Sequence, residues 1–138
     1  MNPFLFKTEP DAYAFGDLVR DGRATWDGVT NALALIHMRT VAKGDTVLVY
    51  HTGGEKAAVG VATVTRGAYA DPKAGDPKRV VVDLAPRQAL ARPVALAEFR
   101  ADPVLAGTEL VRNSRLSVMP LTAAQFARVL ALAKGRGA

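Results

Sequence analysis

The sequence predicts an α+β fold in which a mixed or antiparallel sheet curls into a small twisted β-barrel with helices packed around it. Two observations indicate this class. Hairpins outnumber strand-helix-strand units among the β-prone runs, which favours antiparallel pairing. The clearest helix of the chain has an apolar face that requires a core to pack on. No internal repeat or linker divides the chain, so we expect one domain over residues 1–138.

The first elements are short. Residues 4–8 (FLFKT) are aromatic and β-prone, which predicts an opening strand. Residues 15–22 predict a short helix that ends at its final glycine, and residues 31–39 predict a second helix. Thr30 or Asn31 can serve as the N-cap of this second helix.

A hairpin and a third strand follow. Residues 46–51 and 57–66 are rich in valine and threonine, and the paired glycines of 52–56 mark a tight connection between them. Residues 79–86 form a third β-prone run, after a loop rich in Pro, Gly and Asp at 69–78.

The last third is mainly helical. Residues 94–102 and 103–107 predict two short helical turns, and residues 115–120 predict a last strand. Residues 121–134 predict the clearest helix, because Thr122 and the glutamine three residues later form a capping box ahead of an amphipathic repeat.

Composition narrows the function classes. The chain has no cysteine, which removes thiol chemistry and disulfides and fits a reducing compartment. The N-terminal residues do not resemble a signal peptide, so we expect a cytoplasmic protein. No apolar run approaches the ~20 residues that cross a bilayer, so we expect no membrane association. The net charge of +5 suits a polyanionic partner such as nucleic acid, although the basic residues are scattered.

No motif of a known catalytic or cofactor site is present. The two histidines lie in different elements without ligand spacing, neither serine lies in a nucleophile elbow, and no phosphate-binding glycine loop has the required spacing. We therefore expect no metal, no cofactor and no enzymatic activity. One catalytic alternative stays open, with Glu9 or Asp27 as an acid–base residue acting on a base.

The residue types suit a flat ligand. Trp26 offers a stacking surface, Tyr50 and His51 end a strand with polar aromatic groups, and Asn31 and Ser117 can exchange hydrogen bonds. Stacking combined with hydrogen bonds to the ring edge is how proteins hold an extruded nucleobase. The alternative is that Trp26 is simply an anchor of the hydrophobic core.

Five blocks of the sequence, taken in order, resemble the EVE domain family and cover nearly the whole chain. The most specific motifs are KTEPD at 7–11, WDGV at 26–29, YHT at 50–52 and RLSVMP at 115–120. The resemblance implies a PUA-like fold and a pocket that reads a modified base, such as 5-methylcytosine or 5-hydroxymethylcytosine in DNA or a modified base in RNA. It implies base flipping and no catalysis.

The resemblance also implies a set of site residues. The positions that match the family's pocket motifs are Lys7, Thr8, Glu9, Pro10, Trp26, Asp27, Gly28, Val29, Asn31, Tyr50, His51, Thr52, Arg115, Leu116, Ser117 and Val118. In this role Trp26 would stack on the base, Asn31 and Ser117 would bond to its edge, and Lys7 or Arg115 would meet phosphate.

The chain departs from many relatives just after the WDGV motif. Basic and polar residues are common there, whereas this chain has Thr30, Ala32, Leu33 and Leu35. The change removes arginines suited to phosphate contact, which weakens the case for duplex binding. It leaves open a pocket for a free nucleoside or other planar small molecule, and it leaves open whether the protein is a monomer or a homodimer.

Overall fold

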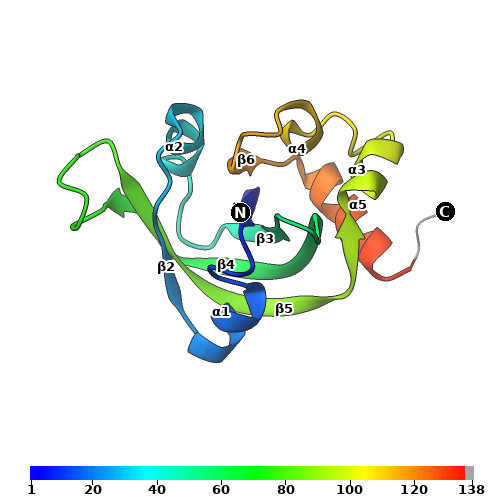
Figure 1. The fold of residues 1–138 in the computed structure, drawn as a ribbon, viewed down its shortest axis with the longest axis horizontal. Helices are drawn as coiled ribbons and strands as arrows, with labels where there is room; N and C mark the ends of the chain where they lie inside the picture. Colours follow the sequence, from blue (N-terminus) through cyan, green and yellow to red (C-terminus); the bar gives the residue numbers. More distant parts are fainter. Residues whose placement is uncertain (136–138) are drawn as a thin grey trace.

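A six-stranded mixed sheet with the order β2-β5-β4-β3-β1-β6 organises the computed structural model, which describes residues 1–135 (Figure 1). The strands are β1 (Pro3–Thr8), β2 (Ala24–Trp26), β3 (Thr46–His51), β4 (Ala57–Ala70), β5 (Val80–Ala95) and β6 (Val118–Pro120). Only β1 and β3 run parallel, and every other neighbouring pair is antiparallel. The sheet curls into a half-barrel, which confirms the predicted fold class.

Helices lie around this curled sheet. They are α1 (Phe15–Asp21), α2 (Ala32–Met38), α3 (Leu96–Ala101), α4 (Glu109–Arg112) and α5 (Ala123–Ala133). Figure 1 shows α2 beside the end of the sheet that carries β2, and α3, α4 and α5 together at the opposite end. The sheet is therefore covered at both ends by segments distant in sequence.

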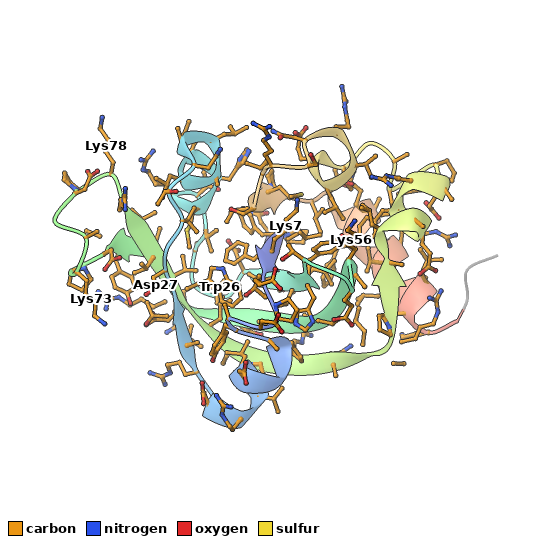
Figure 2. The ribbon with its side chains drawn as sticks, in the orientation of Figure 1. Lys7, Trp26, Asp27, Lys56, Lys73 and Lys78 are labelled. Carbon is orange, nitrogen blue, oxygen red and sulfur yellow. The ribbon has the colours of Figure 1, made fainter. Side chains whose placement is uncertain are left out.

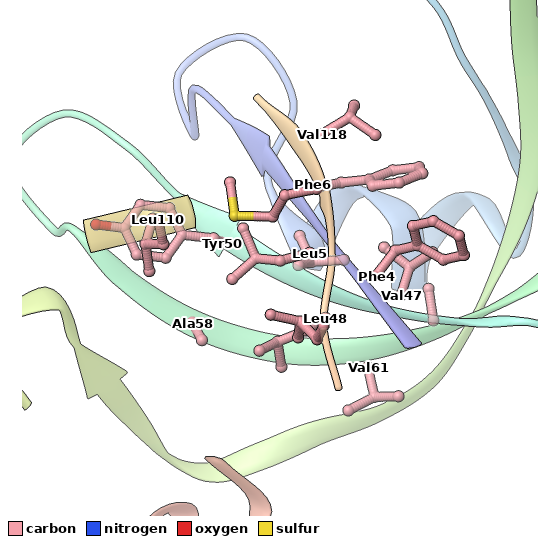
Figure 3. Packing of buried hydrophobic residues seen from close by; sticks show 14 of the residues in the cluster. Phe4, Leu5, Phe6, Val47, Leu48, Tyr50, Ala58, Val61, Leu110 and Val118 are labelled. Carbon is pink, nitrogen blue, oxygen red and sulfur yellow. The ribbon is translucent and has the colours of Figure 1, made fainter. Parts of the chain in front are cut away.

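The core forms around the two parallel central strands (Figure 3). Leu5 and Phe6 of β1 and Val47, Leu48 and Val49 of β3 are fully buried. Central strands of a covered sheet read as continuous apolar runs because both faces are packed. This accounts for the strength of the two strand predictions at 4–8 and 46–51.

Local chemistry sets three helix boundaries as predicted. Gly22 ends α1 with a left-handed φ of 75°, which glycine adopts without the penalty of a Cβ. Asn31 Oδ1 accepts from the Ala34 N–H at 3.0 Å and caps α2. Thr122 Oγ1 accepts from the Gln125 N–H at 3.0 Å, and Gln125 Oε1 accepts from the Thr122 N–H at 2.9 Å, which confirms the capping box of α5.

Two strand predictions were too short. The strand predicted at 57–66 continues as β4 to Ala70. The third β-prone run was expected to end at residue 86, but β5 continues to Ala95 and includes residues 94–95, which were predicted to be helical. The pairing of β4 with β5 shifts register four times along the ladder, including beside Pro86. Such irregular points tolerate a proline, which has no N–H to donate.

The tryptophan lies in a short strand that was not predicted from the sequence. Trp26 closes β2, where it pairs with Val82 of β5. The predicted strand at 115–120 errs in the opposite sense, because only Val118–Pro120 pair with β1.

The apolar helix α2 buries only one of its faces. Ala34, Leu35 and Met38 are buried, whereas Leu33 and Ile36 are 40% and 53% exposed. The helix therefore contributes to the core and also presents apolar side chains on the molecular surface.

Candidate functional site

A pocket of about 700 Å³ lies between the carboxyl ends of β1 and β2, the segment leading into α2, and the bend before β6. We call it the Trp26 pocket. Its lining residues are Lys7, Thr8, Glu9, Ala12, Tyr13, Ala24, Thr25, Trp26, Asp27, Gly28, Val29, Thr30, Asn31, Arg115 and Ser117. The volume lies within the ~300–1,000 Å³ range of small-molecule sites.

The Trp26 side chain belongs to the core and to the pocket wall at once. It is 8% exposed and is part of the main apolar cluster. Its ring centre lies 5.9 Å from that of Phe6 and 6.2 Å from that of Tyr13, and the Tyr13 contact is edge-on at 82°. Aromatic contacts of this geometry hold a ring in place, so the indole forms a fixed wall of the pocket.

Lys7 contributes a cation to the pocket lining (Figure 2). Its Nζ donates to the Ser114 carbonyl oxygen at 2.9 Å, and its backbone N–H donates to the Ser117 carbonyl oxygen, also at 2.9 Å. Burial lowers the pKa of the Lys7 ammonium below its usual value of 10.5. These two bonds tie the end of β1 to the bend that carries Arg115 and Ser117.

Two carboxylates balance the cations of the pocket. Glu9 and Asp27 line it together with Lys7 and Arg115. The Thr52 hydroxyl donates to Glu9 Oε2 at 3.1 Å, which orients that side chain from the end of β3. Thr52 therefore positions a pocket residue although it does not itself line the pocket.

Asn31 divides its side chain between two tasks. Its Oδ1 is engaged in capping α2, as described above. Among residues 1–135, no hydrogen-bond partner is found for its Nδ2 amide, which can therefore donate to a ligand in the pocket. A hydrogen bond from Asn31 to a base edge would have to come from this amide.

Six of the predicted site residues lie elsewhere. They are Pro10, Tyr50, His51, Thr52, Leu116 and Val118, which are absent from the lining of the Trp26 pocket. Tyr50 is only 3% exposed, and Leu116 and Val118 are buried in the core. The Tyr50, Leu116 and Val118 side chains face packed protein and have no route to a ligand in this pocket.

The His51 side chain is engaged by hydrogen bonds within the protein. Its Nε2 accepts from the Phe15 N–H at 2.9 Å at the start of α1, and its Nδ1 lies 2.7 Å from Glu55 Oε1. Because an N–H can only donate, Nε2 is the acceptor and Nδ1 carries the proton. The imidazole therefore joins α1 to the β3–β4 turn.

Five residues that line the pocket were not predicted from the sequence. They are Ala12, Tyr13, Ala24, Thr25 and Thr30. Tyr13 is the most informative, because its hydroxyl donates to Asp21 Oδ2 at 2.9 Å while its ring supports Trp26. Burial and this hydrogen bond raise the pKa of the Tyr13 phenol to about 12. Its position three residues after Pro10 carried no signal of this contact.

Over residues 1–135, no group of three or more His, Asp or Glu side chains could hold a metal ion. No helix in that range is long and apolar enough to span a membrane.

Comparison with known proteins gives a consistent result. The EVE domain family model matches residues 2–132. Thymocyte nuclear protein 1 of Danio rerio is 30% identical over 163 residues, which cover 94% of this chain and 71% of that protein.

Solved structures agree with the family match. An NMR structure of a Rhodopseudomonas palustris protein has a TM-score of 0.92 at 36% identity and covers 97% of this chain and 94% of that chain. Human THYN1 in complex with DNA containing 5-methylcytosine has a TM-score of 0.88 at 25% identity, covering 97% and 98%. The curled sheet with surrounding helices is the PUA-like fold of these relatives. The chain belongs to the EVE domain family.

Proposed function

We propose that this protein is a non-catalytic reader of a modified base in nucleic acid, which it holds in the Trp26 pocket. The observation that carries the proposal is the pocket itself, in which a fixed indole and several hydrogen-bonding groups line one space of about 700 Å³. Base–aromatic stacking contributes ~1–3 kcal/mol per base. The base is 5-methylcytosine or 5-hydroxymethylcytosine in DNA, or a modified base in RNA.

Each wall of the pocket offers a distinct contact. Trp26 stacks on the ring, while the Asn31 amide and the Ser117 hydroxyl bond to its edge. Glu9 or Asp27 accepts from an exocyclic amino group such as N4 of cytosine, which methylation at C5 leaves in place. A base inside a duplex must leave the stack to reach these groups, at a cost of a few kcal/mol.

The comparisons support a nucleic-acid partner. The human THYN1 structure, which covers 97% of this chain, is a complex with DNA containing 5-methylcytosine. Ten of the sixteen site residues expected from the family motifs line the Trp26 pocket, including Lys7, Trp26, Asn31, Arg115 and Ser117.

A second candidate is a free nucleoside or another planar small molecule. The observation that favours it is the charge balance of the pocket, where Lys7 and Arg115 are opposed by Glu9 and Asp27. A balanced pocket attracts a neutral ring without needing a polyanion. This candidate predicts binding nearly independent of salt, whereas a polymer predicts binding that weakens as salt rises.

The test compares short DNA duplexes that carry 5-methylcytosine, 5-hydroxymethylcytosine or plain cytosine at one position, titrated against the protein by fluorescence anisotropy. We expect a preference for one modified duplex that Trp26→Leu abolishes and Trp26→Phe, the matched aromatic control, largely retains. Equal affinity for all three duplexes, or a preference unchanged in Trp26→Leu, would contradict the DNA reader. The same series with RNA oligonucleotides and free nucleosides tests the other ligands.

A catalytic role has a separate test. Glu9 lines the pocket and is oriented by Thr52, so it is the acid–base residue that an enzyme would use here. The reader proposal expects a modified nucleoside to be recovered unchanged after long incubation, with wild type and Glu9→Gln alike. Turnover that Glu9→Gln eliminates would replace the reader by an enzyme.

A further inference from the structure

A second hollow of about 560 Å³ lies directly beside the Trp26 pocket. One side is formed by the α2 region, with Thr30, Ile36 and Arg39, and the other by the β4–β5 loop, with Asp76, Lys78 and Arg79. We call it the Arg39 cleft. Thr30 lines both spaces, so the cleft continues from the mouth of the Trp26 pocket.

The charges of the Arg39 cleft are unbalanced. Arg39, Lys78 and Arg79 face it against a single carboxylate, that of Asp76. Over residues 1–135, none of these three cations takes part in an ion pair with a protein carboxylate. All three are exposed, so an incoming anion meets them without first displacing a protein carboxylate.

The cleft is held in shape by three hydrogen bonds, two of which use backbone N–H groups and leave the Lys78 and Arg79 side chains unengaged. The Lys78 N–H donates to Asp76 Oδ1 at 2.9 Å, and the Arg79 N–H donates to the Asp76 carbonyl oxygen at 3.0 Å. Arg39 Nη2 donates to the Lys78 carbonyl oxygen at 3.0 Å and joins α2 to the loop. Figure 2 shows Lys78 extending from this loop beside α2.

We propose that the Arg39 cleft binds the phosphate backbone of the nucleic-acid strand next to the base held in the Trp26 pocket. The inference rests on the proposed function and adds the path of the strand, which passes over Thr30. Guanidinium groups match phosphate oxygens with two parallel N–H bonds, and Lys78 acts as a point charge. The apolar face of Leu35 and Ile36 offers a surface for the sugar.

The cleft supplies cations that the segment after the WDGV motif lacks. The resemblance implies arginines just after the WDGV motif, at positions where this chain has Thr30 and Leu35. The structure brings cations to the same mouth from elsewhere, from the end of α2 and from the β4–β5 loop. Phosphate binding needs cations at the right place, whichever element supplies them.

The test measures the salt dependence of binding to the short duplex carrying 5-methylcytosine. Lys78→Ala/Arg79→Ala removes two cations and keeps the turn, because its hydrogen bonds use the backbone of both residues. We expect affinity to fall by about tenfold at low salt. The slope of log K against log salt should lose about 0.9 per phosphate contact removed.

Arg87→Ala/Arg100→Ala is the matched control, since it removes the same charge from exposed residues outside the cleft and the pocket. It should leave the slope nearly unchanged. Arg39→Ala is measured separately, with thermal unfolding, because it also removes the bond to the Lys78 carbonyl. The slope of log K against log salt should lose about 0.9, which corresponds to one phosphate contact.

The outcomes separate this inference from the reader function. An unchanged slope in Lys78→Ala/Arg79→Ala, or an equal fall in the control, overturns the cleft while a Trp26-dependent preference still supports the reader. A reduced slope without any preference for the modified duplex overturns the reader and keeps a backbone-binding cleft. No binding to any oligonucleotide overturns both.

Discussion

The Trp26 pocket and the Arg39 cleft meet at Thr30 but are built in opposite ways. The pocket wall is part of the core, with a nearly buried indole packed by Phe6 and Tyr13 and with charges that balance. The cleft wall is an exposed loop joined to α2 by one side-chain hydrogen bond, with cations in excess. Shape recognition needs rigid walls, whereas attraction of a phosphate chain needs only charge in the right place.

The difference predicts how substitutions separate stability from binding. Changes in the pocket should affect folding and base preference together. Changes in the cleft should alter affinity and its salt dependence while leaving stability nearly constant.

The largest effect is expected for Trp26→Ala. Removing a buried tryptophan side chain from a core costs about 3–5 kcal/mol of unfolding free energy, because contacts are lost and a cavity remains. Lys78→Ala/Arg79→Ala, by contrast, should stay within about 0.5 kcal/mol. Urea unfolding of both variants checks the pair of values, and similar midpoints would show that the pocket wall is not part of the core.

Asn31 allows the two tasks of one side chain to be separated. Asn31→Ala should cost about 1 kcal/mol, because α2 loses its N-cap. Asn31→Ser keeps a capping oxygen but has no amide, so its stability should stay close to that of the wild type while its preference for the modified base declines. Preference retained in Asn31→Ser would remove the Nδ2 amide from the binding site.

The lowered pKa of Lys7 predicts that stability and duplex affinity change at alkaline pH. Burial lowers its pKa below 10.5, so the protein loses this charge at lower pH than an unfolded chain does. Because the unfolded chain then binds more protons, the Lys7 contribution to stability rises with pH over that window. Duplex affinity should fall over the same window if the Lys7 cation meets phosphate.

Lys7→Arg is the control for this effect, because arginine keeps its charge throughout. Its duplex affinity should change less with alkaline pH than that of the wild type, measured by anisotropy at constant salt. If the duplex affinities of the two proteins change equally with pH, Lys7 makes no phosphate contact, and the phosphate contacts lie in the cleft alone.

The smallest effect on base preference is expected for Tyr13→Phe. Its pKa of about 12 means that the phenol stays neutral beyond the ordinary range, with its contribution to stability fully present below pH 10.0 and lost as pH rises through about 12. Tyr13→Phe keeps the ring against Trp26 and should change base preference little. The alkaline absorbance titration should lose its highest component in this variant, and a titration that keeps that component would contradict the assignment.

Sequence reasoning reached the features that local chemistry controls. Gly22, Asn31 and Thr122 end or cap helices through contacts a few residues away, and all three predictions are confirmed. The strand β2 was missed because its three residues become a strand only by pairing with β5, more than fifty residues later. Such long-range pairing leaves little trace in a short segment.

The candidate site shows the same division. The four residues of the WDGV motif, Trp26, Asp27, Gly28 and Val29, all line the Trp26 pocket. Tyr50 is buried away from it, because residue type does not reveal which strand faces are packed. The cleft could not be predicted from the sequence, because Arg39 and Lys78 are distant in sequence and come into contact only in the folded protein.

The central claim is that the base stacks on Trp26, and the chain offers a direct probe because it contains a single tryptophan. Selective excitation of the indole during titration with the duplex carrying 5-methylcytosine should give saturable quenching, at the same dissociation constant that anisotropy reports. The plain duplex should quench less at equal occupancy. Full binding by anisotropy with unchanged indole emission would contradict the account.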